Sequence, residues 1–191
     1  MYVQLWCLLL SGLHRKHAIV VCTVYISLLD DIEDPHVKIP ECREPPSKDY
    51  QDNILDSELL ASLIEYLENA MGEGKFRALK GRFVLKLGKE YTYSGDSSQP
   101  SSTDIPPIIS RVVDRVMEKF NLTHRPNSIL INFYPSTESS FCPYHSDDEA
   151  SILADSEIAC LSIGDVRTLK FKGIHHKAES TITPASNSVY T

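Results

Sequence analysis

The stretch SILINFYPSTESSFCPYHSDD, residues 128–148, decides how the chain folds and where its ionisable side chains gather. Its first seven residues are typical of a buried strand, since they are mostly apolar, β-branched or aromatic. Successive side chains of a strand point to opposite faces, so residues two apart share a face. We therefore expect Asn132 and Tyr134 to lie on one strand face, and His145 and Asp147 to lie together on another.

The pair His145 and Asp147 has the residue types and the spacing to bind one metal ion from a single strand face. A mononuclear non-haem Fe(II) centre needs a second histidine, which completes a 2-His-1-carboxylate set and leaves positions open for other ligands. A plain ion pair between the two side chains is the alternative. A calcium loop does not fit, because the acidic run lacks the alternating Asp or Asn positions and the central glycine of an EF-hand.

Two amphipathic helices are predicted before this stretch. The first is capped by Asp56 or Ser57, and its apolar residues recur every three or four positions: Leu59, Leu60, Leu63, Ile64 and Leu67. The second is capped by Thr103 or Asp104 and has one apolar stripe: Ile109, Val112, Val113, Val116, Met117 and Phe120. Strands are predicted in GRFVLKLGKEYTYSG, with a turn at Gly88, and in SILINFY, IACLSI, RTLKFK and STITPASNSVY. Helices followed by antiparallel strands favour an α+β fold with a sandwich or jelly roll.

Composition excludes a protein that coats nucleic acid through bulk charge. The 191 residues carry a formal net charge of −7, whereas broad phosphate binding needs a basic face; a local basic groove is still compatible. The five cysteines are an odd number without paired short spacing, so neither a disulfide framework nor a zinc ribbon is indicated. We expect a reducing compartment, and nuclear or cytoplasmic localisation is favoured over secretion.

Residues 1–52 are predicted to be an apolar N-terminal extension followed by a linker rich in proline and charge. Arg15 and Lys16 separate the two apolar runs, and charges at mid-bilayer depth are costly, so we expect no membrane span. A signal peptide would carry its positive charge before the apolar run. A packed extension and a signal or anchor are the two alternatives for this segment.

Four motifs occur in one order: KEYTYSG at 89–95, NFY at 132–134, HSD at 145–147 and SIGDVRTLKF at 162–171. In this order they resemble the AlkB family of Fe(II)- and 2-oxoglutarate-dependent dioxygenases, and most closely its members that repair DNA. The resemblance implies a domain over residues 53–191 in which N-terminal helices pack on a double-stranded β-helix, or jelly roll. It also implies that this jelly roll is incomplete at its C-terminal end.

The resemblance implies a role for each matching residue. His145 and Asp147 would bind Fe(II), Asn132 and Tyr134 would hydrogen-bond 2-oxoglutarate, and O2 would be the second cosubstrate. The base pocket would consist of Tyr93, stacked on a flipped-out base, with Tyr91, Asp148 and Glu149. Acidic side chains suit an alkylated base because such a base carries a positive charge. Each residue also has a structural alternative. Tyr91 and Tyr93 would be core and rim residues of a strand, Asn132 would be a buried residue that hydrogen-bonds backbone groups, and Arg167 would be a charged residue on a strand face.

The implied function is oxidative dealkylation, chiefly demethylation, of alkylated DNA or RNA bases by a monomer. The family has a second iron histidine and a 2-oxoglutarate arginine farther along the chain than Thr191, while His175 and His176 occur in a polar connection typical of a loop. We therefore expect an incomplete site and little or no turnover by the 191 residues alone. Two alternatives remain at this stage: a non-catalytic jelly roll that binds nucleic acid or protein, and a dioxygenase for a protein or small molecule.

Overall fold

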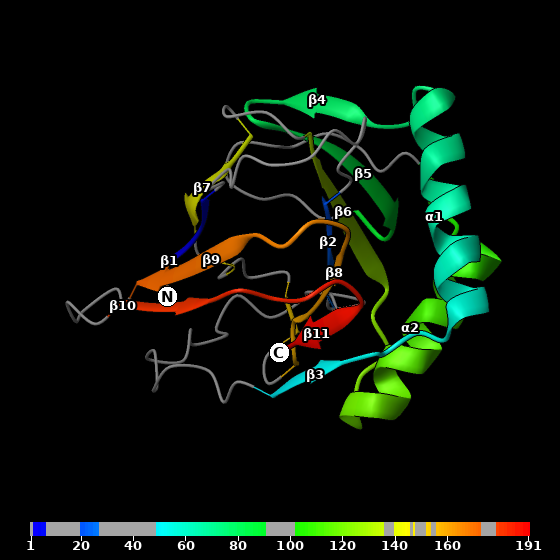
Figure 1. Ribbon diagram of the computed structural model, residues 1–191. Helices are drawn as coiled ribbons and strands as arrows, with labels where there is room; N and C mark the ends of the chain where they lie inside the picture. The colour runs from blue at the N-terminus through cyan, green and yellow to red at the C-terminus, as the bar shows by residue number, and fades with distance from the viewer. Residues whose placement is uncertain are drawn as a thin grey trace, which may run out of the picture.

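The computed structural model describes residues 2–6, 20–26, 49–90, 102–135, 140–145, 147, 152–153, 156–172 and 179–191. These residues form two antiparallel sheets and two helices, so the predicted α+β class is confirmed (Figure 1). The larger sheet has the order β3 (Tyr50–Asp52), β11 (Ser188–Tyr190), β8 (Ala159–Ile163), β2 (Val20–Ile26), β6 (Ser128–Tyr134), β5 (Arg82–Gly88) and β4 (Arg77–Leu79). The smaller sheet has the order β10 (Glu179–Ile182), β9 (Thr168–Lys172), β1 (Tyr2–Trp6) and β7 (Cys142–His145).

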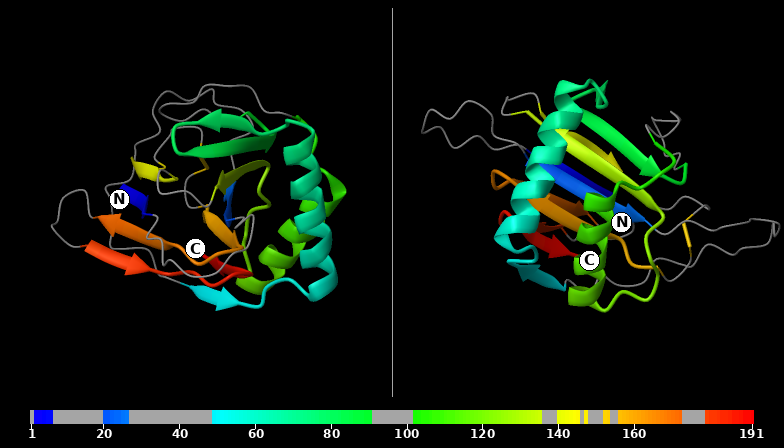
Figure 2. Two further views of the ribbon diagram at one scale, coloured as in Figure 1. Left: turned by 45° about the horizontal axis from the view of Figure 1, so that its top comes forward. Right: turned by 90° about the vertical axis from the view of Figure 1, so that its right-hand side faces the viewer.

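Helices α1 (Ser57–Gly72) and α2 (Pro107–Phe120) cover one face of the larger sheet, as Figure 2 shows. The predicted apolar stripes face inward, and their most buried members are Leu59, Leu63, Leu67, Ile109, Val112, Val113 and Val116. These side chains form one core with alternate residues of β5, β6 and β8: Leu85, Leu87, Ile129, Ile131, Ala159, Leu161 and Ile163. Burying this apolar surface is the main favourable contribution to the free energy of folding.

The two helices begin in different ways. Asp56 caps α1 as predicted, because its carboxylate accepts a hydrogen bond from the backbone N–H of Leu59 at 2.9 Å. The prediction that Thr103 or Asp104 caps α2 is wrong, since the N-cap is Pro106 and no side chain caps this helix. A residue before a proline is pushed into an extended conformation, so Pro106, which precedes Pro107, cannot continue a helix upstream.

Strand β5 ends at Gly88, where the sequence predicts a turn. Gly88 has a φ of +83°, and a Cβ added there would lie 2.3 Å from the backbone oxygen of Asn127. Glycine is therefore required by both the left-handed backbone and the close approach of the neighbouring chain.

The N-terminal strands lie inside the sheets. Strand β2 pairs with β6 on one side and with β8 on the other, and β1 pairs with both β7 and β9. The predicted boundary at residue 52 stays a prediction, but these pairings join the N-terminal strands to strands of the predicted domain. Among the residues that the structure describes, no helix is long and apolar enough to cross a membrane.

The predicted C-terminal strand STITPASNSVY is divided between the two sheets. Strand β10 belongs to the smaller sheet and β11 to the larger one, and Pro184, which has no N–H to donate, lies between them. Asn187 precedes β11 with a φ of +60°, and its buried side chain binds the backbone of Leu55 twice: Oδ1 accepts from the N–H at 2.9 Å and Nδ2 donates to the carbonyl at 2.8 Å. This amide therefore links the backbone just before α1 to the backbone just before β11.

We expect Asn187→Ala to lower the free energy of unfolding by about 2–4 kcal/mol, because two buried backbone groups of Leu55 lose their partners and alanine disfavours a left-handed φ. Asn121→Ala is the matched control, since Asn121 also has a left-handed φ, of +51°, but is exposed. The free energy of unfolding of this control should fall by only about 1 kcal/mol. Urea unfolding of both variants measures the difference, and equal losses would contradict a structural role for the Asn187 amide.

Candidate functional site

The first motif, NFY, lies on β6 with Asn132 and Tyr134 on the same face, as the sequence predicts. Both side chains are buried, with exposed fractions of 5% for Asn132 and 3% for Tyr134. Their face of the larger sheet is the one turned away from the helices. Tyr134 belongs to a buried cluster that includes Cys142, Leu169 and Phe171 of the smaller sheet, so the motif lies between the two sheets.

Two buried basic side chains share this inner face, and the sequence reasoning missed both. The register of β5 and β6 places Val84 opposite Asn132, so Arg82 and Lys86, each two residues from Val84, point the same way as Asn132 and Tyr134. Arg82 is 9% exposed and Lys86 is 5% exposed. Alternation within RFVLKLG was the available signal, because it places the two cations on the face opposite Phe83, Leu85 and Leu87.

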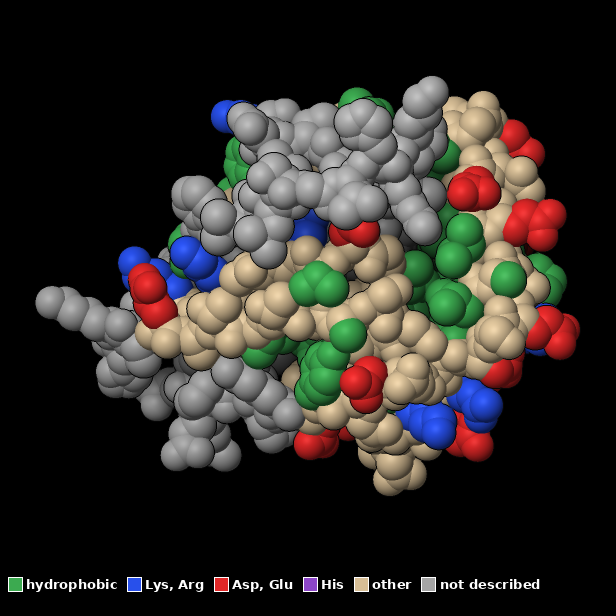
Figure 3. All heavy atoms as spheres, viewed as in Figure 1, with side chains coloured by type: hydrophobic (Ala, Val, Ile, Leu, Met, Phe, Trp, Pro, Cys, Tyr) green, Lys and Arg blue, Asp and Glu red, His purple; other side chains and the backbone are tan. Residues whose placement is uncertain are grey.

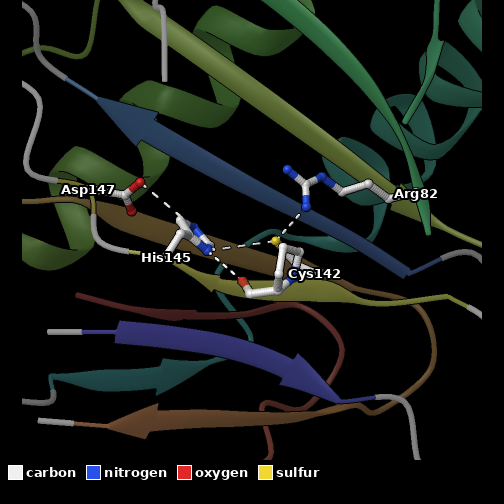
Figure 4. A network of polar contacts seen from close by, with 5 residues as sticks. Arg82, Cys142, His145 and Asp147 are labelled. Atoms are coloured by element: carbon white, nitrogen blue, oxygen red, sulfur yellow. Dashed lines mark hydrogen bonds and ion pairs between the residues drawn. The ribbon is translucent and has the colours of Figure 1, made fainter. Parts of the chain in front are cut away.

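His145 is the last residue of β7, and Asp147 follows it closely (Figure 4). The imidazole Nδ1 lies 2.9 Å from the backbone oxygen of Pro143. A carbonyl only accepts hydrogen bonds, so Nδ1 carries the proton and Nε2 is the nitrogen left for other partners. Nε2 lies 3.8 Å from Oδ1 of Asp147, and the two side chains are 34% and 25% exposed.

Cys142 and Arg82 extend this group into the interior. The Arg82 guanidinium donates a hydrogen bond to the Cys142 Sγ, which lies 3.8 Å from Nδ1 of His145 (Figure 4). Burial by itself lowers the pKa of His145, but Cys142, the Asp147 carboxylate and the Pro143 carbonyl outweigh it and raise this pKa from 6.5 to about 9. The imidazole is therefore held as a cation when nothing else binds it.

The pair His145 and Asp147 fits two positions of a 2-His-1-carboxylate metal set. The Pro143 carbonyl fixes the ring and directs Nε2 toward the carboxylate, which is the usual second-sphere support for a metal-binding histidine. Within the described residues, no three His, Cys, Asp or Glu side chains gather closely enough to hold a metal ion. The described part of the chain therefore brings together two side chains of the types that bind a metal ion, His145 and Asp147.

The motif SIGDVRTLKF covers the end of β8, the connection that follows it and most of β9. Arg167, in the connection, donates hydrogen bonds from Nη2 to the backbone oxygens of Tyr134 at 3.3 Å and Pro135 at 2.9 Å. Two of the motifs that are far apart in the sequence therefore meet at the end of β6.

Six residues weighed from the sequence lie outside the described residues: Tyr91, Tyr93, Asp148, Glu149, His175 and His176. The base pocket that the first four would form stays a prediction.

Comparison with known proteins identifies the family. The sequence model of the 2OG-Fe(II) oxygenase superfamily matches residues 59–190. Similar proteins include the alpha-ketoglutarate-dependent dioxygenase alkB homolog 3 of Mus musculus, 37% identical over 82 residues, which are 43% of this chain and 27% of that protein. Another is the tRNA (carboxymethyluridine(34)-5-O)-methyltransferase ALKBH8 of Mus musculus, 26% identical over 134 residues, which are 67% of this chain and 20% of that protein.

The chain thus spans about a quarter or less of the length of these curated relatives. No solved structure matches it significantly.

We expect the His145 imidazole of the metal-free protein to titrate near pH 9 in an NMR titration. Because the folded pKa lies above 6.5, the interactions of the imidazolium stabilise the fold fully below pH 6.5 and are lost as the pH rises through about 9. A metal ion needs unprotonated Nε2, so metal binding at pH 7 should release this proton. Asp147→Asn should lower the titration midpoint, and a wild-type midpoint at or below 6.5 would contradict the described contacts.

Proposed function

The chain belongs to the 2OG-Fe(II) oxygenase superfamily, and on that premise we propose that it forms the AlkB-like part of a dioxygenase that removes alkyl groups from nucleic-acid bases. The reaction is an oxidative demethylation of the repair type, with alkylated DNA or RNA as the substrate and a monomer as the active species. The two antiparallel sheets, with helices on the outer face of the larger one, support a jelly roll as the finer description of this fold.

One observation carries the proposal: His145 and Asp147 face each other across 3.8 Å, with Nδ1 of the histidine held by a carbonyl of its own strand. These two side chains would hold Fe(II), and a further ligand would come from residues outside the described ranges. Bound there, Fe(II) would supply an oxidation by O2, in which one oxygen atom converts 2-oxoglutarate to succinate and CO2 and the other hydroxylates the N-alkyl group, which then leaves as an aldehyde. The protein contributes binding, orientation and exclusion of water.

The inner face of the larger sheet suits an anionic cosubstrate. Asn132 and Tyr134 would hydrogen-bond 2-oxoglutarate, and the buried cations Arg82 and Lys86 lie on the same face. Cations near a buried dicarboxylate offset the cost of removing it from water. The side chains between the sheets thus favour a small dianion over a neutral ligand.

The names of the relatives support a nucleic-acid substrate, and the mixed surface charge of this chain limits how that substrate would bind. One relative is named as a tRNA methyltransferase, and the other as a dioxygenase of the AlkB type. In Figure 3, both acidic and basic side chains of the described residues appear on the visible face, and these residues form no uniformly basic surface there. We propose a local contact, in which one base leaves the stack and enters a pocket made by Tyr91, Tyr93, Asp148 and Glu149.

Mass spectrometry of methylated DNA and RNA oligonucleotides tests this function. The longest natural form of the protein that contains this sequence is incubated with Fe(II), 2-oxoglutarate and O2, and we expect bases to lose methyl groups as formaldehyde. His145→Ala and Asp147→Ala should reduce the product to the level without enzyme, because each removes a metal ligand. The matched controls, His124→Ala and Asp114→Asn, change exposed side chains and should retain activity.

Two results would contradict this proposal. The first is formation of succinate from 2-oxoglutarate with a peptide or small molecule while methylated oligonucleotides stay unchanged, which would indicate a dioxygenase for another substrate. The second is dealkylation that survives loss of His145, which would remove this residue from the metal site.

A further inference from the structure

The strand that carries His145 is only partly fixed by its own sheet. Within the described residues, β7 is the outermost strand of the smaller sheet, so backbone pairing holds it along one edge. That pairing contains a register shift: Val3 of β1 lies opposite His145, whereas Leu5, two residues farther along β1, lies opposite the residue three positions before His145. A register shift interrupts the regular ladder, so other contacts must fix the position of His145.

The turn between β4 and β5 contacts the start of β7. The backbone N–H of Phe141 donates a hydrogen bond to the carbonyl oxygen of Gly81 at 3.0 Å. At the next position of each segment, the Arg82 guanidinium donates a hydrogen bond from Nη1 to Sγ of Cys142 (Figure 4). These four residues form a clasp between the larger sheet and β7.

The clasp is closely packed and buried. Gly81 has a φ of +81°, and a Cβ added there would lie 2.7 Å from the carbonyl oxygen of Phe141, so glycine is required for this approach. Arg82 and Cys142 are 9% and 5% exposed. A hydrogen bond from a charged donor is stronger than one between neutral groups, and burial shields it from water. The clasp therefore fixes the start of β7 against the larger sheet.

The larger sheet is the better-supported side of the clasp. Strand β5 begins at Arg82 and pairs with β4 along one edge and with β6 along the other. Its register places Phe83 opposite Phe133, so the adjoining residues, Arg82 and Tyr134, lie at the same end of the strand pair. Tyr134 is one of the two residues proposed to bind the cosubstrate. The clasp thus connects a strand pair of the cosubstrate site to the strand that carries His145.

We propose that Arg82 is a positioning residue of the metal site: through Cys142 it sets where His145 lies relative to the residues that bind the cosubstrate. This inference rests on the proposed function, since it concerns the same metal pair. The Pro143 carbonyl orients the imidazole within β7 but cannot place β7 itself, because both groups belong to one strand. His145 and Asp147 lie on one side of the inter-sheet layer and the cosubstrate residues on the other. A displaced β7 therefore weakens binding of the cosubstrate more than binding of the metal.

Hydrogen exchange and calorimetry on the longest natural form of the protein test the clasp. In the metal-free protein, Cys142→Ala should speed exchange of the Phe141 amide proton by about 10-fold. This is the lower end of the range for a hydrogen bond from a charged group, because sulfur is a weak acceptor. With Mn²⁺ in place of Fe(II), the same variant should raise the dissociation constant of 2-oxoglutarate by about 10-fold and leave that of Mn²⁺ itself nearly unchanged.

Three further variants make the comparison specific. Cys142→Ser keeps an acceptor for Arg82, so both measurements should stay near the wild-type values. Cys160→Ala removes another buried thiol of the same apolar cluster, but on β8, and it should change neither measurement. Arg82→Met combined with Cys142→Ala should speed exchange at Phe141 no more than Cys142→Ala alone, because both changes break one contact.

Wild-type affinity for 2-oxoglutarate in Cys142→Ala would overturn this inference while the proposed function stands. Equal losses in Cys160→Ala would also overturn it, since they would indicate a general loosening between the sheets. A further loss of exchange protection in the double variant would show that Arg82 acts without Cys142. Wild type that binds no 2-oxoglutarate with Mn²⁺ would overturn both proposals. If Cys142→Ala does not fold, Arg82→Met decides, and wild-type exchange at Phe141 in that variant contradicts the assignment.

Discussion

Both sheets depend on strands that enter them from the N-terminal end of the chain. Strand β2 pairs along its whole length with β6, from Val20 opposite Tyr134 to Ile26 opposite Ser128, and its other edge pairs with β8. Within the described part of the larger sheet, β2 therefore lies between β6 and β8. The residues proposed for the cosubstrate lie on β6, and the Arg167 side chain, which follows β8, reaches across to the backbone at the end of β6.

The two faces of the larger sheet have opposite chemistry, and this division connects the fold to the site. The outer face has apolar side chains under α1 and α2, where burial stabilises the fold without specific geometry. The inner face has Arg82, Lys86 and Asn132, which are buried and therefore need polar partners in fixed positions. Because side chains alternate along a strand, every second one stabilises the core under the helices, and the others form the polar layer between the sheets.

The sequence predicted much of the fold because the relevant signals were local. Asp56 caps α1, the stripes of both helices face the core, and alternation in SILINFY brings Asn132 and Tyr134 to one face. The failures concern interactions between distant segments. Three of these interactions join residues that are far apart in the chain: the pairing of β1 and β2 inside the sheets, the contact of Arg82 with Cys142 and the contact of Arg167 with Pro135. No periodic pattern records such partners, and the α2 cap was missed because proline geometry overrode the side-chain preference.

We propose above that His145 and Asp147 bind one metal ion between the sheets. Anomalous X-ray scattering from crystals grown with Mn²⁺ and 2-oxoglutarate tests it most directly. The predicted result is a manganese peak about 2.0–2.2 Å from both His145 Nε2 and an Asp147 carboxylate oxygen, with Nδ1 still bound to the Pro143 carbonyl. A manganese peak that touches neither side chain, or none at saturating Mn²⁺, would contradict the account.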